Sequence, residues 1–240
     1  MAHFGFPLET IIVFFAVIFF SIYMDLVAHK NSEEITVKNA AMWSLFWISL
    51  AVAFYVYLYI RFDSSWADLY LAGYVLEKSL SIDNLMVFVA IFASFGITGK
   101  LQHCILYWGI LGALVFRAIF VVLGTGLFAA SPWVGFVFAL FVLWSGWKML
   151  TAKEETEEIE DYTNHWAVRW VGKIMPVLPK LHGYNFFVKH AELKAEELAN
   201  VTRKGLRYAT PAFLCLIAIE TSDVAFAFDS VPAVIAVTQE

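Results

Sequence analysis

One apolar segment of this chain, residues 69–95, carries ionisable side chains at its middle. The segment is long enough to cross the hydrocarbon core of a bilayer as a helix, which needs about 20 residues. Glu77, Lys78 and Asp83 lie near its centre. Ionisable groups inside a spanning helix are costly, so they usually face the bundle interior and mark an ion pathway. The segment therefore predicts a membrane protein whose function lies at these charged positions.

Five further segments are comparably apolar, which predicts several membrane crossings. The chain is 61% hydrophobic and 15% charged, whereas a soluble domain usually carries about 25% charged residues. We predict an all-α fold, a polytopic bundle of transmembrane helices, with five helices in residues 1–150 and a sixth in residues 207–240. The expected spans are 8–28, 40–60, 69–95, 103–129, 133–150 and 208–237. The formal net charge of -5 gives no indication of nucleic-acid binding.

The long polar region, residues 151–206, is expected to be a cytoplasmic loop. Lys and Arg are concentrated here and in the loops after the first and third segments. Cytoplasmic loops carry the excess of these residues, so the N-terminus is expected outside. The region is too short for a sizeable core of its own. Residues 188–199 have the pattern of an amphipathic helix on the membrane surface.

A second acidic stretch, residues 220–232, lies in the last apolar segment. In the predicted topology this segment is antiparallel to residues 69–95, so the two stretches meet near the bilayer midplane. They also resemble each other. Each has an acid, five further residues and an Asp, from Glu77 to Asp83 and from Asp223 to Asp229. Three helices followed by three of opposite orientation form an inverted repeat, a pattern typical of transporters.

The two stretches together predict one cation site. Their carboxylate, amide and hydroxyl oxygens are hard ligands, which suit Mg²⁺, Ca²⁺ or Mn²⁺ better than Zn²⁺ or Cu⁺. Carboxylates held close together out of water can also exchange protons against the cation. On a straight helix, acids six residues apart point about 120° away from each other, so the site needs locally unwound helices or several neighbours. The candidate metal ligands are Glu77, Asp83, Asn84, Glu220, Asp223 and Asp229.

Other polar side chains could support this site. Two basic residues would offset its negative charge when no metal is bound, and serines would extend the polar path. Alternatively, the acids only pair with the basic residues to hold helices together. Asp25, near the end of the first segment, either reaches the headgroups or faces the bundle. The supporting residues are Asp25, Lys78, Arg117, Ser222 and Ser230.

Residues 77–88 (EKSLSIDNLMVF) and 219–233 (IETSDVAFAFDSVPA) resemble the TerC family of integral membrane proteins. The family includes Alx-type manganese exporters and tellurium-resistance proteins. The resemblance implies Mn²⁺ efflux across a bacterial inner membrane, with the acids of both motifs as the binding groups. Family members usually continue past the second motif with further helices. We therefore expect this chain to be a fragment that lacks the C-terminal helices.

A different class of function remains open, a membrane stress or scaffold protein for tellurite resistance or for metalation of secreted proteins. An enzyme is not predicted, because the sequence has no HExxH or nucleotide-binding motif and no arrangement typical of a Ser-His-Asp triad. No prosthetic group is expected. The expected partners are the lipid bilayer, a divalent cation and protons.

Overall fold

The computed structural model describes residues 7–28, 36–151, 161–194, 201 and 205–238. Some helical side chains, including those of Asp25, Asp83 and Asp229, lie outside this description. Residues Met1–Leu50 and Ala51–Glu240 form two separate units. The first unit holds α1 (Leu8–Ala28) and the start of α2 (Val37–Arg61). The second unit holds all the elements that follow.

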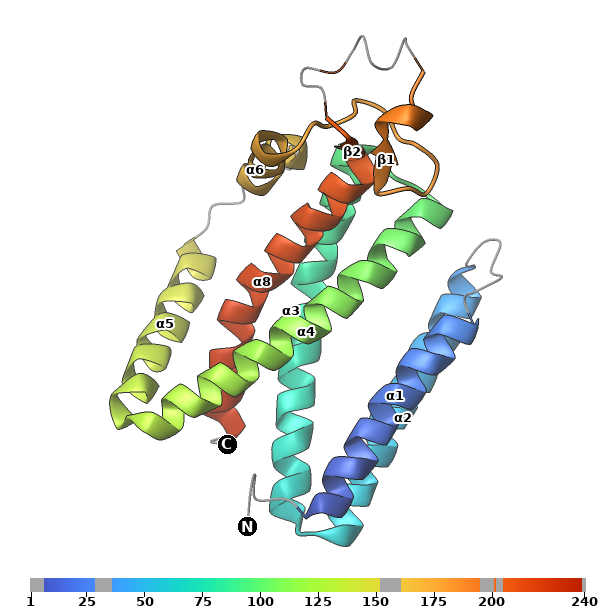
Figure 1. Cartoon of the computed structure of the whole chain (residues 1–240). Coiled ribbons are helices and arrows are strands. Elements are labelled where there is room, and N and C mark those ends of the chain that lie inside the picture. The colour runs from blue at the N-terminus through green and yellow to red at the C-terminus, as the bar shows by residue number, and fades with distance from the viewer. Residues whose placement is uncertain (1–6, 29–35, 152–160, 195–200, 202–204, 239–240) are drawn as a thin grey trace. The chain divides into compact units, whose positions relative to one another are not determined.

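The second unit is built on long helices, in agreement with the predicted all-α membrane bundle (Figure 1). Its helices after α2 are α3 (Ser64–Phe95), α4 (Lys100–Ala130), α5 (Pro132–Thr151), α6 (Trp166–Ile174) and α8 (Pro211–Thr238). Each of the six apolar segments found in the sequence is helical over most of its length, but the last one, expected from residue 208, becomes helical only at Pro211, because Tyr208 and Ala209 belong to a strand. Among the described residues, three helical stretches are long and apolar enough to cross a membrane: Val37–Arg61, Lys100–Leu127 and Pro211–Ile235.

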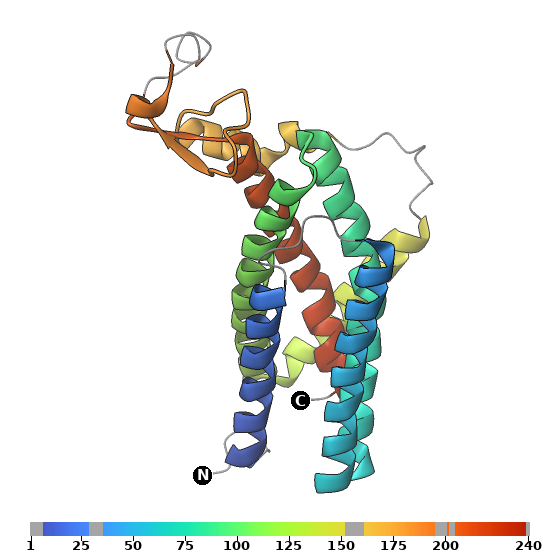
Figure 2. The same cartoon turned by 90° about the vertical axis from the view of Figure 1, so that its right-hand side faces the viewer.

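Helix α8 is the element on which α3, α4 and α5 all pack. It runs antiparallel to α3 and in the same direction as α4 (Figures 1 and 2). The parallel pair is close, because a Cβ atom on Gly109 of α4 would lie 3.2 Å from Ile219. Because glycine has no side chain, Gly109 lets α8 pack closely against α4. Antiparallel packing of α3 and α8 brings the two acidic stretches to similar depth.

Local signals in the sequence explain how α3 starts and ends. Asp63 precedes the helix, and its carboxylate accepts a 2.7 Å hydrogen bond from the Ser64 N–H. Gly96 ends the helix with φ of 62°, a conformation that glycine adopts without steric cost. Gly99, with φ of 63°, then begins the turn into α4. This short connection makes α3 and α4 successive antiparallel helices.

The polar region corrects one prediction. Phe187–Lys189 is a strand, β1, rather than the start of an amphipathic helix over 188–199. It pairs antiparallel with β2 (Arg207–Ala209), and Val188 is buried in a small core with Leu178, Leu193 and Tyr208. In β1 only the middle residue, Val188, is buried, and the strand is held by its pairing with β2. The local periodicity of the sequence does not show a pairing partner that lies elsewhere in the chain. Residues 195–200 of the expected helix lie outside the described part of the chain.

Candidate functional site

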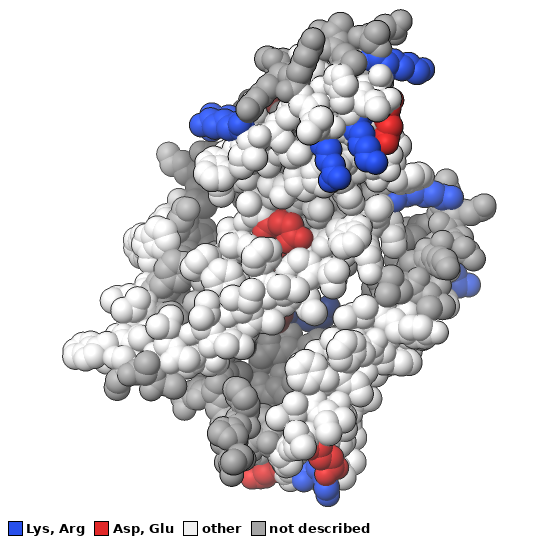
Figure 3. All heavy atoms as spheres, in the orientation of Figure 1, with Lys and Arg blue, Asp and Glu red and all other residues white. Residues whose placement is uncertain are grey.

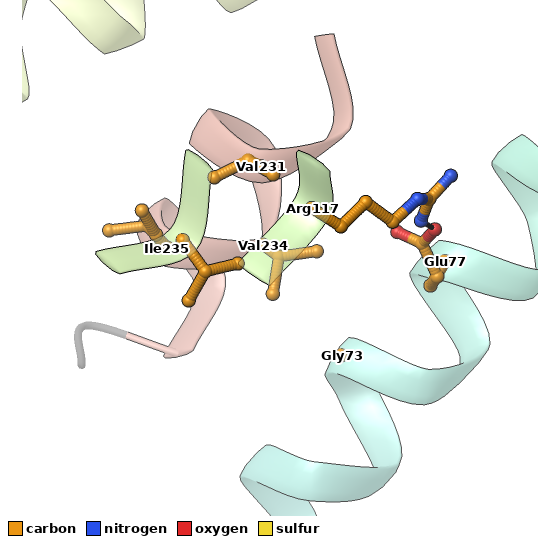
Figure 4. Close-up of a pocket in the computed structure, with 7 residues that line it drawn as sticks. Gly73, Glu77, Arg117, Val231, Val234 and Ile235 are labelled. Carbon is orange, nitrogen blue, oxygen red and sulfur yellow. Dashed lines mark ion pairs between the residues drawn. The ribbon is translucent and has the colours of Figure 1, made fainter. Parts of the chain in front are cut away.

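Arg117 lies where three helices of the second unit approach one another. On α4, its guanidinium forms an ion pair with Glu77 of α3, and these two side chains point toward each other in Figure 4. A second guanidinium nitrogen, Nη2, lies 3.7 Å from Asp223 Oδ1 on α8. Asp223 is almost fully buried, whereas Glu77 and Arg117 are partly exposed. Equivalent acids of the two motifs therefore share one cation.

Glu220 occupies a notch in the surface of α4. A Cβ atom on Gly112 would overlap the Glu220 carboxylate, so only glycine leaves room for this side chain. The other α4 glycines with close neighbours, Gly109 and Gly124, face apolar side chains of α8 instead. The sequence signal was the run of glycines in this segment, although it did not indicate which of them would face an acid. Gly126, by contrast, has no neighbour within 4 Å of its Cβ position.

Several oxygens of α8 are buried without a hydrogen-bond partner among the described residues. They are Glu220 Oε2, Asp223 Oδ2 and Ser230 Oγ. Buried polar atoms nearly always have a partner, because an unpaired one costs about 1–3 kcal/mol. Three acids here, Glu77, Glu220 and Asp223, are accompanied by one described arginine. The described cluster therefore has more acids than bases, and it holds acceptor oxygens that no described residue satisfies.

A pocket of about 270 Å³ adjoins the Glu77–Arg117 pair. The pair forms its polar wall, and the other lining residues are apolar or glycine (Figure 4). A liquid water occupies about 30 Å³, so the pocket can hold several waters beside the ion pair. Its lining residues are Gly73, Glu77, Arg117, Val121, Val231, Val234 and Ile235. The Glu77–Arg117 pair therefore borders a cavity whose other walls are apolar or glycine.

Not every predicted residue joins this cluster. Lys78 is exposed, and its ammonium lies 5.9 Å from the centre of the Tyr74 ring. Asn84 and Ser222 are half-buried. The side chains of Asp25, Asp83 and Asp229 lie outside the description. Within the residues described, no three His, Cys, Asp or Glu side chains form a metal-binding group. The predicted metal ligands thus stay a prediction, and Arg117 is the described partner of Glu77 and Asp223.

Comparisons with known proteins add a family relationship. The family described as "Integral membrane protein TerC family" matches residues 62–240. "Tellurium resistance protein TerC" of Serratia marcescens is 47% identical over 99% of this chain and 71% of its own length. The protein of the same name from Alcaligenes sp is 45% identical over the same shares. The Alx protein of Escherichia coli (strain K12) is 35% identical over 93% of this chain and 67% of its own length. No solved structure matches the chain.

Proposed function

The chain belongs to the TerC family of integral membrane proteins, and we propose that it is a divalent-cation transporter that exports Mn²⁺ from bacteria. The observation that carries this proposal is the cluster at Arg117. It joins both acidic motifs, and it retains buried carboxylate oxygens that no described residue satisfies. Charged groups within a membrane bundle usually mark a functional site, such as an ion pathway, a proton relay or a ligand counter-ion.

The cation would bind among the acids of α3 and α8. Their oxygens suit Mn²⁺, and Asp83 and Asp229 complete the proposed ligand set together with Asn84. Arg117 offsets part of the negative charge of Glu77 and Asp223 while no metal is bound, so an entering cation must compete with its guanidinium. Such competition lets the site release its cargo, because a site with only acids would hold a divalent ion too tightly. Protons from either side can replace the departing ion.

The proposed localisation is the bacterial inner membrane with the N-terminus outside. This orientation rests on the loop asymmetry of Lys and Arg. It places the polar region, which lies beside the start of α8, in the cytoplasm. Basic side chains gather over this end of the molecule (Figure 3). The exposed ones include Arg169, Lys173, Lys180, Lys189, Lys194 and Arg207.

A scaffold or stress protein is the second candidate. Two of the relatives are named for tellurium resistance. The contacts of Arg117 with α3 and α8 would serve equally well to hold a bundle together. The two candidate functions predict different effects when the length of an acidic side chain is changed. Lengthening an acid by one methylene in Asp83→Glu would disturb metal coordination and stop transport, but a purely electrostatic scaffold would tolerate the change.

The test is Mn²⁺ accumulation in cells that lack their own exporter and express the full-length protein. We expect the wild type to lower cellular Mn²⁺. Glu220→Gln, Asp83→Asn and Asp229→Asn should abolish this effect while the proteins still reach the membrane. Lys78→Gln is the matched control, because Lys78 is exposed and lies over Tyr74. Full activity in all three acid variants would rule out the site, and an inactive wild type would favour the scaffold.

A further inference from the structure

Helix α6 lies across the end of the bundle at which α8 begins (Figure 1). It packs on α8 and on the short 3-10 helix η1 (Tyr162–Asn164). Its inner side is formed by Ala167 and Val168, and Val171 packs against the same core. That core also contains Ala212 at the start of α8. The buried inner side therefore holds α6 on the bundle, and the outer side of the helix is exposed.

The outer side carries a stripe of large apolar side chains. Trp166, Trp170 and Ile174 are 59%, 63% and 64% exposed, respectively. They are spaced by four residues, so they lie above one another along one side of the helix. Two tryptophans and an isoleucine facing water at adjacent positions are unfavourable, and such patches usually mark an interaction surface.

A basic stripe lies beside the apolar one. Arg169 and Lys173 are exposed and are also four residues apart. With 3.6 residues per turn, the order around α6 is the buried side, then the apolar stripe, then the basic stripe. The apolar stripe is thus next to the bundle, and the charges lie beyond it. This order matches a helix that lies in a bilayer interface, with apolar groups toward the acyl chains and cations among the phosphates.

We propose that α6 is an interfacial helix whose Trp166–Trp170–Ile174 stripe inserts into the headgroup layer beside α8, with Arg169 and Lys173 binding anionic phospholipid. Charge complementarity favours lipid over a protein partner, since basic side chains outnumber acidic ones among the described residues at this end of the molecule (Figure 3). Continuity also favours it, because α6 packs directly on α8, which is long and apolar enough to span the membrane. Tryptophan is enriched at this depth of a bilayer. The inference is independent of any transport activity.

Nitroxide labels at two positions test the proposal in the full chain, reconstituted in phosphatidylcholine vesicles with and without phosphatidylglycerol. Cys104→Ala and Cys215→Ala remove the native thiols, and Trp170→Cys or Gly172→Cys introduces the label. Gly172 is the matched control, because it is exposed on the same helix and a Cβ there meets nothing within 4 Å. We expect the ratio of collisions with oxygen to collisions with a water-soluble nickel complex to be severalfold higher at position 170.

Neutralising the basic stripe tests the lipid contact. Arg169→Gln with Lys173→Gln should lower the ratio at position 170 severalfold in vesicles that contain phosphatidylglycerol, and should leave it unchanged in phosphatidylcholine alone. Equal nickel access at both positions would overturn the proposal by placing α6 in water. Protection of position 170 from both reagents would overturn it in favour of a protein partner.

A second measurement avoids the cysteine replacements. The emission of Trp170 is obtained as the difference between the wild type and Trp170→Phe. Brominated lipids should quench it more strongly when the bromines lie near the headgroups than when they lie deep in the acyl chains. Quenching by dissolved iodide instead would contradict the proposal.

Discussion

Glu77 and Asp223 approach the same guanidinium group, that of Arg117, from two antiparallel helices. They are the equivalent first acids of two similar motifs. The planar guanidinium has several N–H donors, so one arginine can interact with two carboxylates at once. Arg117 is partly buried and has both acids as partners. The relationship therefore links α3, α4 and α8 through one side chain.

Removing this cation should destabilise the protein. We expect Arg117→Gln to lower the free energy of unfolding by about 3 kcal/mol, because it leaves two carboxylates without their counter-charge. Denaturant unfolding in detergent measures the loss. Lys78→Gln, on the exposed side of α3, should change stability by about 0.5 kcal/mol or less. Equal losses in the two variants would show that Arg117 has no special position.

The same substitution should have the opposite effect on cation binding. If Arg117 competes with the metal, Arg117→Gln removes the competitor and should lower the apparent Kd for Mn²⁺ about tenfold, a change of about 1.4 kcal/mol. The measurement is the increase in unfolding midpoint on titration with Mn²⁺, since a ligand stabilises the state that binds it. Adding Glu220→Gln should abolish the gain. A weaker Mn²⁺ response in Arg117→Gln would contradict the competition.

The notch at Gly112 gives a steric prediction. Gly112→Ala should cost about 1–3 kcal/mol, because the new methyl overlaps the Glu220 carboxylate and forces it to move. Gly126→Ala, on the same helix with open space around it, should be neutral or slightly stabilising. Combining Gly112→Ala with Glu220→Asp should recover part of the loss, because the shorter acid leaves more space. Thermal unfolding of the four proteins separates these outcomes, and identical midpoints for Gly112→Ala and Gly126→Ala would disprove the notch.

Helix positions could be predicted from the sequence because lipid leaves the backbone few choices. In hydrocarbon every N–H and C=O must be paired within the segment, so a long apolar run becomes a helix. The first apolar segment, expected over 8–28, is Leu8–Ala28 in the structure. The polar region was harder, since strand β1 depends on pairing with β2, which lies far along the chain. The periodicity of the sequence around β1 does not show where its pairing partner lies.

The candidate site could be predicted only in part. Glu77, Asp223 and Arg117 lie in apolar segments, where an unpaired charge costs free energy. Such charges usually face the bundle interior and pair with one another, so the sequence indicates that these residues lie inside the bundle. Spacing could not say which cation would pair with which acid, because Lys78 and Arg117 were equally available. That choice depends on how α3 and α4 are rotated on α8, and packing of small residues sets the rotation. The metal ligands themselves stay a prediction, since two of them lie outside the described side chains.

Thr210 joins the polar region to α8 and should be important for stability. It is fully buried, and its hydroxyl donates hydrogen bonds of 2.7 and 3.1 Å to the carbonyl oxygens of Asn185 and Phe186. Thr210→Val keeps the shape and the 3.0 Å hydrogen bond from the backbone N–H of residue 210 to Phe186, but it removes the hydroxyl donor of the Asn185 carbonyl, so we expect a loss of about 1–2 kcal/mol. Thr125→Val is the control, because that exposed hydroxyl only donates within its own helix, to Val121. Denaturant unfolding should show almost no change for the control, and an equal change in both would argue against the link.

Asp161 should make the start of the polar region sensitive to acid. Its carboxylate accepts hydrogen bonds from the hydroxyl and the N–H of Thr163 and from the Asn164 amide, which lower its pKa below the ordinary value. A lowered folded-state pKa contributes stability above the unfolded value, about 3.9, and this contribution is lost as pH falls through the folded value. The contribution should therefore be present near neutral pH and disappear in acid.

Hydrogen exchange of the η1 amides measures this effect. At about pH 6, Asp161→Ala should exchange severalfold faster than the wild type, and the ratio of the two rates should fall as the pH drops through the lowered pKa of Asp161 and the wild type loses its charge. Thr163→Val should give an intermediate ratio, because it removes the hydroxyl donor and keeps the N–H. Comparing variants at the same pH cancels the intrinsic pH dependence of exchange. A ratio that stays constant from neutral pH through the acid range in which Asp161 takes up its proton would mean that the Asp161 carboxylate does not hold η1 in place through its charge.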